Sequence, residues 1–170
     1  MAKRLVSLVS LTIFVLMCST QAVMAKKADC TEKEKEVVAI NFAKEMIDGG
    51  YKAVSTEDLK KWIDSKKAML IVDTMPYEKS YKNNHIPGAV QFEFPIPAMN
   101  TMDDKKKAEF VKLLGPDKDK TVVIYCGFVK CTRSHNGATW AVKLGYKNVF
   151  RHPGGIFAWK GMKYQVEKAK

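Results

Sequence analysis

The chain lacks internal repeats and low-complexity segments, and it contains few cysteines. Four cysteines occur among 170 residues, and one of them lies within the first 25, so the chain is not a small scaffold held together by disulfides. No Cys-x-x-Cys-His haem attachment site occurs, and Cys126, Cys131 and His135 do not have the spacing of a standard zinc site. We therefore expect no metal and no other cofactor.

Motifs for nucleic-acid recognition are also absent. The formal net charge of +11 could attract nucleic acid, anionic lipid or small anions. However, the lysines are scattered and accompanied by acidic residues, as in Lys33–Glu36 and Asp103–Lys107, and no aromatic stacking pattern accompanies them. We expect a solvated, lysine-rich surface that helps to attract small anions, and no nucleic-acid partner.

The first 25 residues predict a cleaved secretory signal peptide. A short basic segment precedes the apolar run Leu5–Met17, which is too short for a comfortable membrane span, and Val23–Ala25 offers small or aliphatic residues at the cleavage site. Lipidation at Cys18 and an uncleaved anchor are the alternatives, and Met17 disfavours lipidation. Cleavage leaves 145 residues with a net charge of +9, which predicts a single exported, periplasmic domain without stable membrane insertion.

Strand and helix patterns alternate along the rest of the chain, which predicts an α/β fold with a parallel sheet in three layers. The expected strands are Ala68–Asp73, Ala89–Phe92, Thr121–Tyr125 and Val149–Arg151, and the expected helices are Thr31–Asp48, Ser55–Ile63, Asp103–Leu114, Ser134–Leu144 and Ile156–Trp159. The first helix has an apolar stripe of Val38, Phe42, Ala43, Met46 and Ile47. We interpret residues 26–50 as a helical extension of a domain over residues 51–170.

Cys126 is the strongest candidate for a nucleophile. It directly follows the apolar strand Thr121–Tyr125, and a loop leads from it to the helix expected at Ser134. Loop amides and the positive end of a helix favour a thiolate, so we expect a pKa below the roughly 8.5 of a free cysteine. Arg133 has the geometry to bind a sulfonate or phosphate-like group, or it forms a structural salt bridge. Lys130 is a second anion contact or an exposed loop residue.

Three separated segments resemble the signatures of the rhodanese-like domains. The segments are Leu70–Asp73 with His85–Ala89, Tyr125–Cys126 with Arg133–Ser134, and Asn148–Val149 with Gly154–Trp159. They correspond in order to the first signature, the active-site loop and the closing signature of the family, over about Ser55–Lys160. The resemblance implies a five-stranded, mostly parallel sheet. It also implies that Cys126 accepts sulfane sulfur as a persulfide and passes it to a thiol or cyanide.

The loop departs from the family pattern in its length. Six residues separate Cys126 from Arg133, where the resemblance implies four for sulfurtransferases and five for related phosphatases and arsenate reductases. We expect the loop to bind substrate through Gly127, Phe128, Val129, Lys130, Cys131, Thr132 and Arg133. Met75 stands where the family often has arginine. Three residues are expected to support the site: Asp73, Ser134 and His135.

Several functions remain open at this point. The first is a sulfurtransferase that takes sulfur from thiosulfate or a persulfide carrier and delivers it to an acceptor, such as a thiol-containing protein. The second is a phosphatase or arsenate reductase with an enlarged loop, although Phe128 and Val129 offer no obvious polar contacts. The third is a non-catalytic redox or sulfur-carrier module. Three roles are open for Cys131: it resolves a persulfide on Cys126, it forms a protective disulfide with Cys126, or it is inert. Cys30 has no identified partner.

Overall fold

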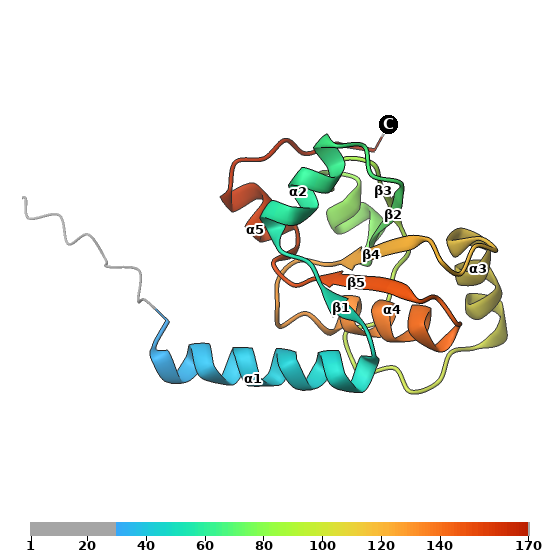
Figure 1. The fold of residues 1–170 in the computed structure, drawn as a ribbon, viewed down its shortest axis with the longest axis horizontal. Helices are drawn as coiled ribbons and strands as arrows, with labels where there is room; N and C mark the ends of the chain where they lie inside the picture. The colour runs from blue at the N-terminus through green and yellow to red at the C-terminus, as the bar shows by residue number, and fades with distance from the viewer. Residues whose placement is uncertain (1–29, 170) are drawn as a thin grey trace, which may run out of the picture. The chain divides into compact units, whose positions relative to one another are not determined.

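The computed structural model describes residues 30–169 (Figure 1). The signal peptide expected at residues 1–25, with Cys18, lies outside the described residues. From Lys33 onward the chain forms one compact unit. Among residues 30–169, no helix has both the length and the apolar character that crossing a membrane requires.

A single five-stranded sheet with entirely parallel pairing forms the centre of this unit. The strands are β1 (Lys52–Ala53), β2 (Met69–Asp73), β3 (Ala89–Gln91), β4 (Thr121–Tyr125) and β5 (Asn148–His152), in the order β1-β5-β4-β2-β3. The predicted parallel sheet is confirmed. Strand β1 was not predicted, because two residues are too few to show an alternating pattern. Strand β4 is central, so β2 and β5 flank its carboxyl end, which is where parallel sheets place their ligands.

The helices also follow the predicted order, with small shifts at their ends. They are α1 (Glu32–Gly49), α2 (Thr56–Asp64), α3 (Asp104–Leu114), α4 (Thr132–Lys143) and α5 (Gly155–Gly161), with a π-helical turn at Tyr77–Tyr81. Side chains that accept backbone N–H groups cap two of them: Ser55 Oγ accepts from Asp58 at the start of α2, and Asp103 Oδ1 accepts from Lys106 at the start of α3. Helix α4 begins two residues earlier than predicted, because only Cys131 keeps an extended backbone before it.

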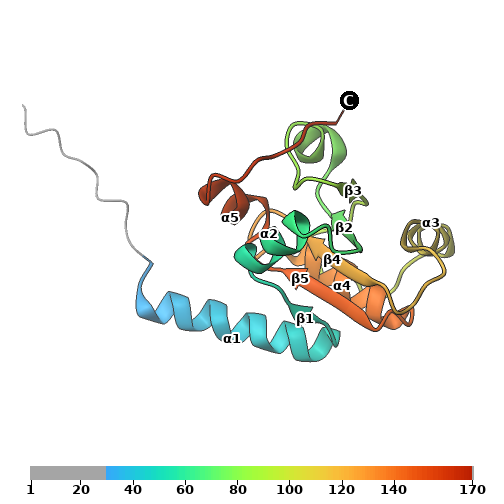
Figure 2. The same ribbon diagram turned by 45° about the horizontal axis from the view of Figure 1, so that its top comes forward.

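The helices cover both faces of the sheet and give three layers. Neighbouring side chains on β4 point to opposite faces. Val122 and Ile124 belong to the core cluster that also includes residues of α3 and α4. Val123 and Tyr125 belong to the cluster that includes residues of α2 and α5. Figures 1 and 2 show α2 and α5 on one side of β4 and β5, and α4 on the other.

Helix α1 is confirmed, but part of its predicted apolar stripe is wrong. Val38, Phe42 and Met46 are half-buried, whereas Ala43 is exposed and Ile47 is 79% exposed. The inward face instead includes Glu45, which forms an ion pair with a buried arginine of β5. A charged side chain therefore occupies a place on this face that an apolar pattern does not predict.

Candidate active site

Strand β4 delivers Cys126 to the carboxyl edge of the sheet, where the start of α5 fixes its backbone. The N–H of Ile156 donates to the Cys126 carbonyl over 2.9 Å, and the N–H of Phe157 donates to the Gly127 carbonyl over 3.0 Å. Gly155 has a φ of +57°, and a Cβ there would lie 2.2 Å from the Cys126 carbonyl oxygen. Only glycine permits this close approach, which explains the glycine at the first position of α5.

The loop after Cys126 folds back over its thiol. The N–H of Cys131 donates to the Phe128 carbonyl over 3.0 Å, which closes a turn. Cys126 Sγ lies 3.1 Å from Ser134 Oγ, 3.4 Å from the Cys131 carbonyl oxygen and 3.6 Å from the Phe128 carbonyl oxygen. The Cys126 residue is only 1% exposed, so the loop is closed over it.

The two loop cysteines have opposite electrostatic environments. Burial, together with a hydrogen bond shared with Cys131, raises the pKa of the Cys126 thiol. The same hydrogen bond lowers the pKa of Cys131 to about 6, and the backbone N–H groups of Arg133 and Gly127 assist. The predicted low pKa of Cys126 is therefore wrong for this closed loop. The stabilised thiolate is that of Cys131, because the loop amides interact with its sulfur.

The side chain of Arg151, in β5, has no exposed surface, and it forms hydrogen bonds with the loop that follows Cys126. Its Nε donates to Ser134 Oγ over 2.9 Å. Its Nη2 donates to the carbonyls of Val129, over 2.8 Å, and Cys131, over 3.1 Å. This buried cation therefore positions both the loop and the hydroxyl that contacts Cys126. Arg151 was predicted only as a strand residue, and the one signal for its role was a charged side chain directly after the apolar Val149 and Phe150.

A second set of contacts joins Arg151 to α1 and α4. Arg151 Nη1 forms an ion pair with Glu45 and donates to the Tyr51 hydroxyl over 3.1 Å. The Tyr51 hydroxyl also lies 2.9 Å from His135 Nδ1, and burial lowers the pKa of His135. Because the Tyr51 hydroxyl oxygen accepts a hydrogen bond from Arg151, the hydroxyl can donate its own proton in a hydrogen bond to His135 Nδ1. The predicted supporting residue His135 thus belongs to this network.

A cleft of about 510 Å³ opens beside the loop, and Cys131 lines it. Its other lining residues include the apolar Met75, Ile96, Phe128, Ile156 and Phe157 and the basic Lys79, Lys130, Arg133 and Lys160. The rings of Phe128 and Phe157 stack with their centroids 5.7 Å apart. Among the described residues, no carboxylate lines this cleft. The basic side chains of the cleft suit an anionic ligand, and its apolar side chains leave room for an apolar group on that ligand.

Arg133 faces this cleft, but part of its guanidinium group is already engaged. Its Nη1 lies 3.2 Å from Glu93 Oε1 and also donates to the Phe94 carbonyl. Lys130 is exposed at the rim, and Thr132 begins α4. Arg133 therefore lines the cleft, as the anion-binding role requires, and it also bonds to Glu93 and Phe94, as the structural role requires.

Asp73 is buried at the end of β2, level with Tyr125 in the adjacent strand. Its Oδ1 accepts from the N–H of Met75 over 2.8 Å, and burial raises its pKa. The groups that influence this carboxylate include Tyr125 and His85. Asp73 thus shares the edge of the sheet with Cys126, and its described contacts are those of a strand-end cap.

The chain was compared with protein families, with curated proteins and with solved structures. The model of the family described as "Rhodanese-like domain" matches residues 55–162. A curated relative, the tRNA uridine(34) hydroxylase of Erwinia tasmaniensis, is 29% identical over 127 residues, which cover 72% of this chain and 33% of that protein. The chain therefore spans about a third of the length of this relative.

Solved structures show the same fold at low identity. The BH2092 protein of Bacillus halodurans has a TM-score of 0.56 and 22% identity, with 79% of this chain and 86% of that chain covered. Thiosulfate sulfurtransferase of Pseudomonas aeruginosa has a TM-score of 0.58 and 19% identity, with 78% and 23% covered. These similarities concern the arrangement of the sheet and helices around the cysteine loop.

Proposed function

This chain belongs to the rhodanese-like domain family, and on that premise we propose that it is a sulfurtransferase with Cys126 as its sulfur carrier. The observation that supports this most is the position of Cys126. It lies at the carboxyl end of the central strand, within the matched residues, with Ser134 Oγ 3.1 Å from its sulfur. The thiol would take sulfane sulfur as a persulfide and pass it to a thiol or cyanide.

The first step in the proposal is loss of the Cys126 proton. In the closed loop, burial raises the pKa of this thiol, so the proton passes to solvent once the loop opens and exposes the Cys126 sulfur. The Ser134 hydroxyl, supported by Arg151 Nε, can then turn its proton toward the Cys126 thiolate. With thiosulfate as donor, the Cys126 thiolate attacks the outer sulfur, its S–S bond to the sulfonate breaks, and sulfite leaves with the bonding pair.

Sulfur uptake also needs the loop to open. Cys126 is 1% exposed and does not line the cleft, whereas Phe128, Lys130 and Cys131 of the same loop do. A movement of residues 127–131 would bring the Cys126 sulfur to the cleft. The loop carbonyls that now face this sulfur would turn away, and loop N–H groups would become available to the persulfide anion.

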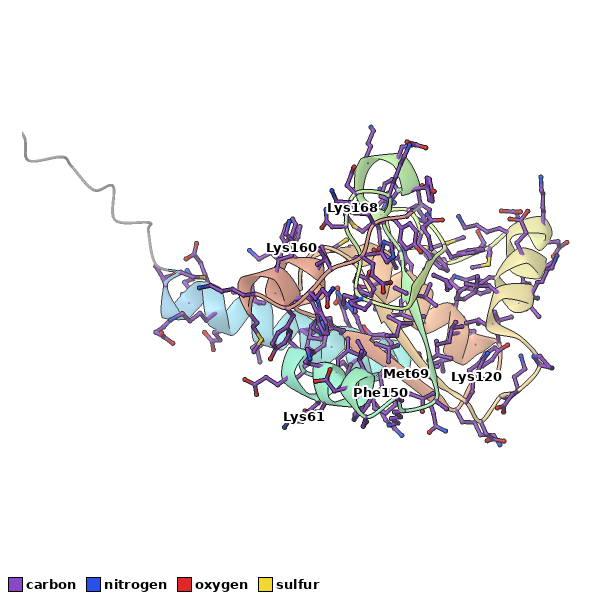
Figure 3. All side chains as sticks on the ribbon, turned by 90° about the horizontal axis from the view of Figure 1, so that it is seen from above. Lys61, Met69, Lys120, Phe150, Lys160 and Lys168 are labelled. Carbon is purple, nitrogen blue, oxygen red and sulfur yellow. The ribbon has the colours of Figure 1, made fainter. Side chains whose placement is uncertain are left out.

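We propose a small anionic sulfur compound or a persulfide carrier as donor, and a thiol, including that of an acceptor protein, as acceptor. The basic rim of the cleft supports this choice. Elsewhere the lysines are spread over separate elements, which does not favour a nucleic-acid surface. Figure 3 labels three of them, on α2, before β4 and near the C-terminus: Lys61, Lys120 and Lys168.

The test follows the sulfur and the sulfite together. Reduced wild-type protein and the variants Cys126→Ser, Cys131→Ser and Cys30→Ser are mixed with thiosulfate. We expect one equivalent of sulfite per chain from the wild type and from Cys30→Ser, whose cysteine is exposed and lies outside the matched residues 55–162. Cys131→Ser should add the mass of one sulfur atom, and Cys126→Ser should release no sulfite. Sulfite release by Cys126→Ser would overturn the assignment, and phosphate release from an aryl phosphate would favour a phosphatase.

We also propose that the protein is exported after cleavage near residue 25. The support is the pattern of residues 1–25. Expression of the full chain followed by fractionation and mass measurement tests this. A periplasmic product that begins near Lys26 is expected, and a full-length cytoplasmic product would contradict it.

A further inference from the structure

The two loop cysteines lie together but face different surroundings. Cys126 is buried, and Cys131 is partly exposed and lines the cleft. The turn from Phe128 to Cys131 brings the Cys131 carbonyl oxygen within 3.4 Å of Cys126 Sγ. Each of the two side chains also shifts the pKa of the other, upward for Cys126 and downward for Cys131. The loop therefore brings the backbone of Cys131 into contact with the sulfur of Cys126.

Cys131 also has the properties of an attacking thiol. Its pKa is lowered to about 6, so it is a thiolate at neutral pH. In thiol–disulfide chemistry an attacking thiolate needs direct access to one sulfur of an S–S bond. Cys131 would have that access to a persulfide on Cys126 from the same short loop, because its own carbonyl oxygen already contacts the Cys126 sulfur.

We infer that Cys131 is a resolving thiol, which discharges a persulfide on Cys126 as hydrosulfide and leaves a Cys126–Cys131 disulfide. This inference rests on the proposed function. The Cys131 sulfur attacks the inner sulfur of the persulfide, a bond forms between the two cysteine sulfurs, and the bond to the outer sulfur breaks. The outer sulfur takes up a proton from solvent and leaves with the electron pair as hydrosulfide. It is reduced, and the Cys131 sulfur is oxidised by the same amount.

An external dithiol reductant then restores the two thiols by ordinary exchange. The cleft beside Cys131 is the approach for that reductant, because Cys131 is the member of the pair that lines it. An acceptor that captures the outer sulfur before Cys131 attacks would bypass the disulfide. The pair therefore makes the fate of the sulfur depend on the supply of acceptor: transfer when acceptor is present, and hydrosulfide when it is absent.

The test is a single turnover without acceptor. Reduced protein is loaded with thiosulfate, sulfite is measured, the donor is removed by desalting, and hydrosulfide and intact mass are followed. Wild type and Cys30→Ser should release one hydrosulfide per sulfite and end two hydrogens lighter than the dithiol form. Cys131→Ser should release sulfite but keep its added sulfur, at least tenfold longer than the wild type. Cys131→Ala should behave as Cys131→Ser does, and circular dichroism should show both variants folded.

The outcomes separate the two proposals. If sulfite is released normally but the wild type keeps its sulfur as long as Cys131→Ser does, the resolving role is overturned and sulfur transfer stands. If neither the wild type nor Cys131→Ser releases sulfite, the sulfurtransferase proposal fails and the resolving role fails with it. A disulfide that includes Cys30 instead of Cys131 would also overturn the inference.

Discussion

Glu45 and Arg151, which are 106 positions apart in the sequence, form an ion pair beneath the cysteine loop. The Arg151 side chain has no exposed surface, and that of Glu45 is 31% exposed. A buried guanidinium is costly unless its charge is balanced and its N–H groups are satisfied. Because Arg151 also donates hydrogen bonds to the loop carbonyls, this ion pair connects α1 to the loop.

Removal of the Glu45 charge should therefore destabilise the protein. We expect Glu45→Gln to lower the free energy of unfolding by about 1–2 kcal/mol, because it leaves a buried cation without its anion at a partly solvated site. Urea unfolding measures this. The matched control is Glu36→Gln, which changes an exposed position on the same helix and should cost less than about 0.5 kcal/mol. Equal losses in the two variants would contradict the role of the pair.

Gly155 should tolerate no side chain. Gly155→Ala combines a positive φ with a Cβ 2.2 Å from a backbone oxygen of Cys126, so we expect a loss of about 3 kcal/mol or more and a displaced loop. Gly161→Ala is the control, since a Cβ there meets no atom within 4 Å. Thermal unfolding and sulfite release should both be impaired in the first variant and near normal in the second. A stable, active Gly155→Ala would show that the contact does not fix the loop.

The reactivity of Cys131 should titrate at unusually low pH. Its pKa is lowered to about 6 by the hydrogen bond from Cys126, so its alkylation rate should level off above neutral pH and fall as the pH drops through 6. Iodoacetamide labelling of Cys30→Ser, followed by mass spectrometry, measures this. In a variant that also carries Cys126→Ala, the hydrogen bond is lost and the midpoint should move upward. A midpoint near 8.5 with Cys126 present, the value of a free thiol, would contradict the shared hydrogen bond.

The contact between Arg133 and Glu93 should limit anion binding. Glu93→Gln removes the carboxylate 3.2 Å from Arg133 Nη1, so we expect a KM for thiosulfate that is lower by a few-fold. Arg133→Gln should raise that KM by about tenfold, equivalent to about 1.4 kcal/mol. Steady-state kinetics with cyanide as acceptor measures both. Opposite shifts are required, and an unchanged KM in Arg133→Gln would remove this residue from the substrate site.

The sequence predicted most of the fold because its signals are local. The run Thr121–Tyr125 is apolar and β-branched, and β4 has these same limits. The helices expected from Ser55 and from Asp103 are present as α2 and α3, and these two side chains cap them. A cysteine between a strand and a helix also marked the loop correctly, since both its neighbours were recognisable from their patterns.

The environment of the site could not be predicted in the same way. Whether Cys126 or Cys131 is the thiolate depends on which backbone groups the folded loop turns toward each sulfur. The pairing of Arg151 with Glu45 depends on how α1 packs against β5, and no local pattern carries that information. Burial of a charged residue is decided by its distant partners, so a sequence-based prediction of a lower pKa for Cys126 was reversed by the closed loop.

The central claim, that Cys126 carries the sulfur, is tested most directly by peptide mapping. Lys120, Lys130 and Arg133 allow trypsin to separate a peptide with Cys126 from one with Cys131. Cys131→Ser is loaded with thiosulfate, its persulfides are alkylated at once, and the digest is sequenced by mass spectrometry. The added sulfur is predicted on the 121–130 peptide, at Cys126. Sulfur on Cys30 alone, or on no cysteine, would contradict the claim.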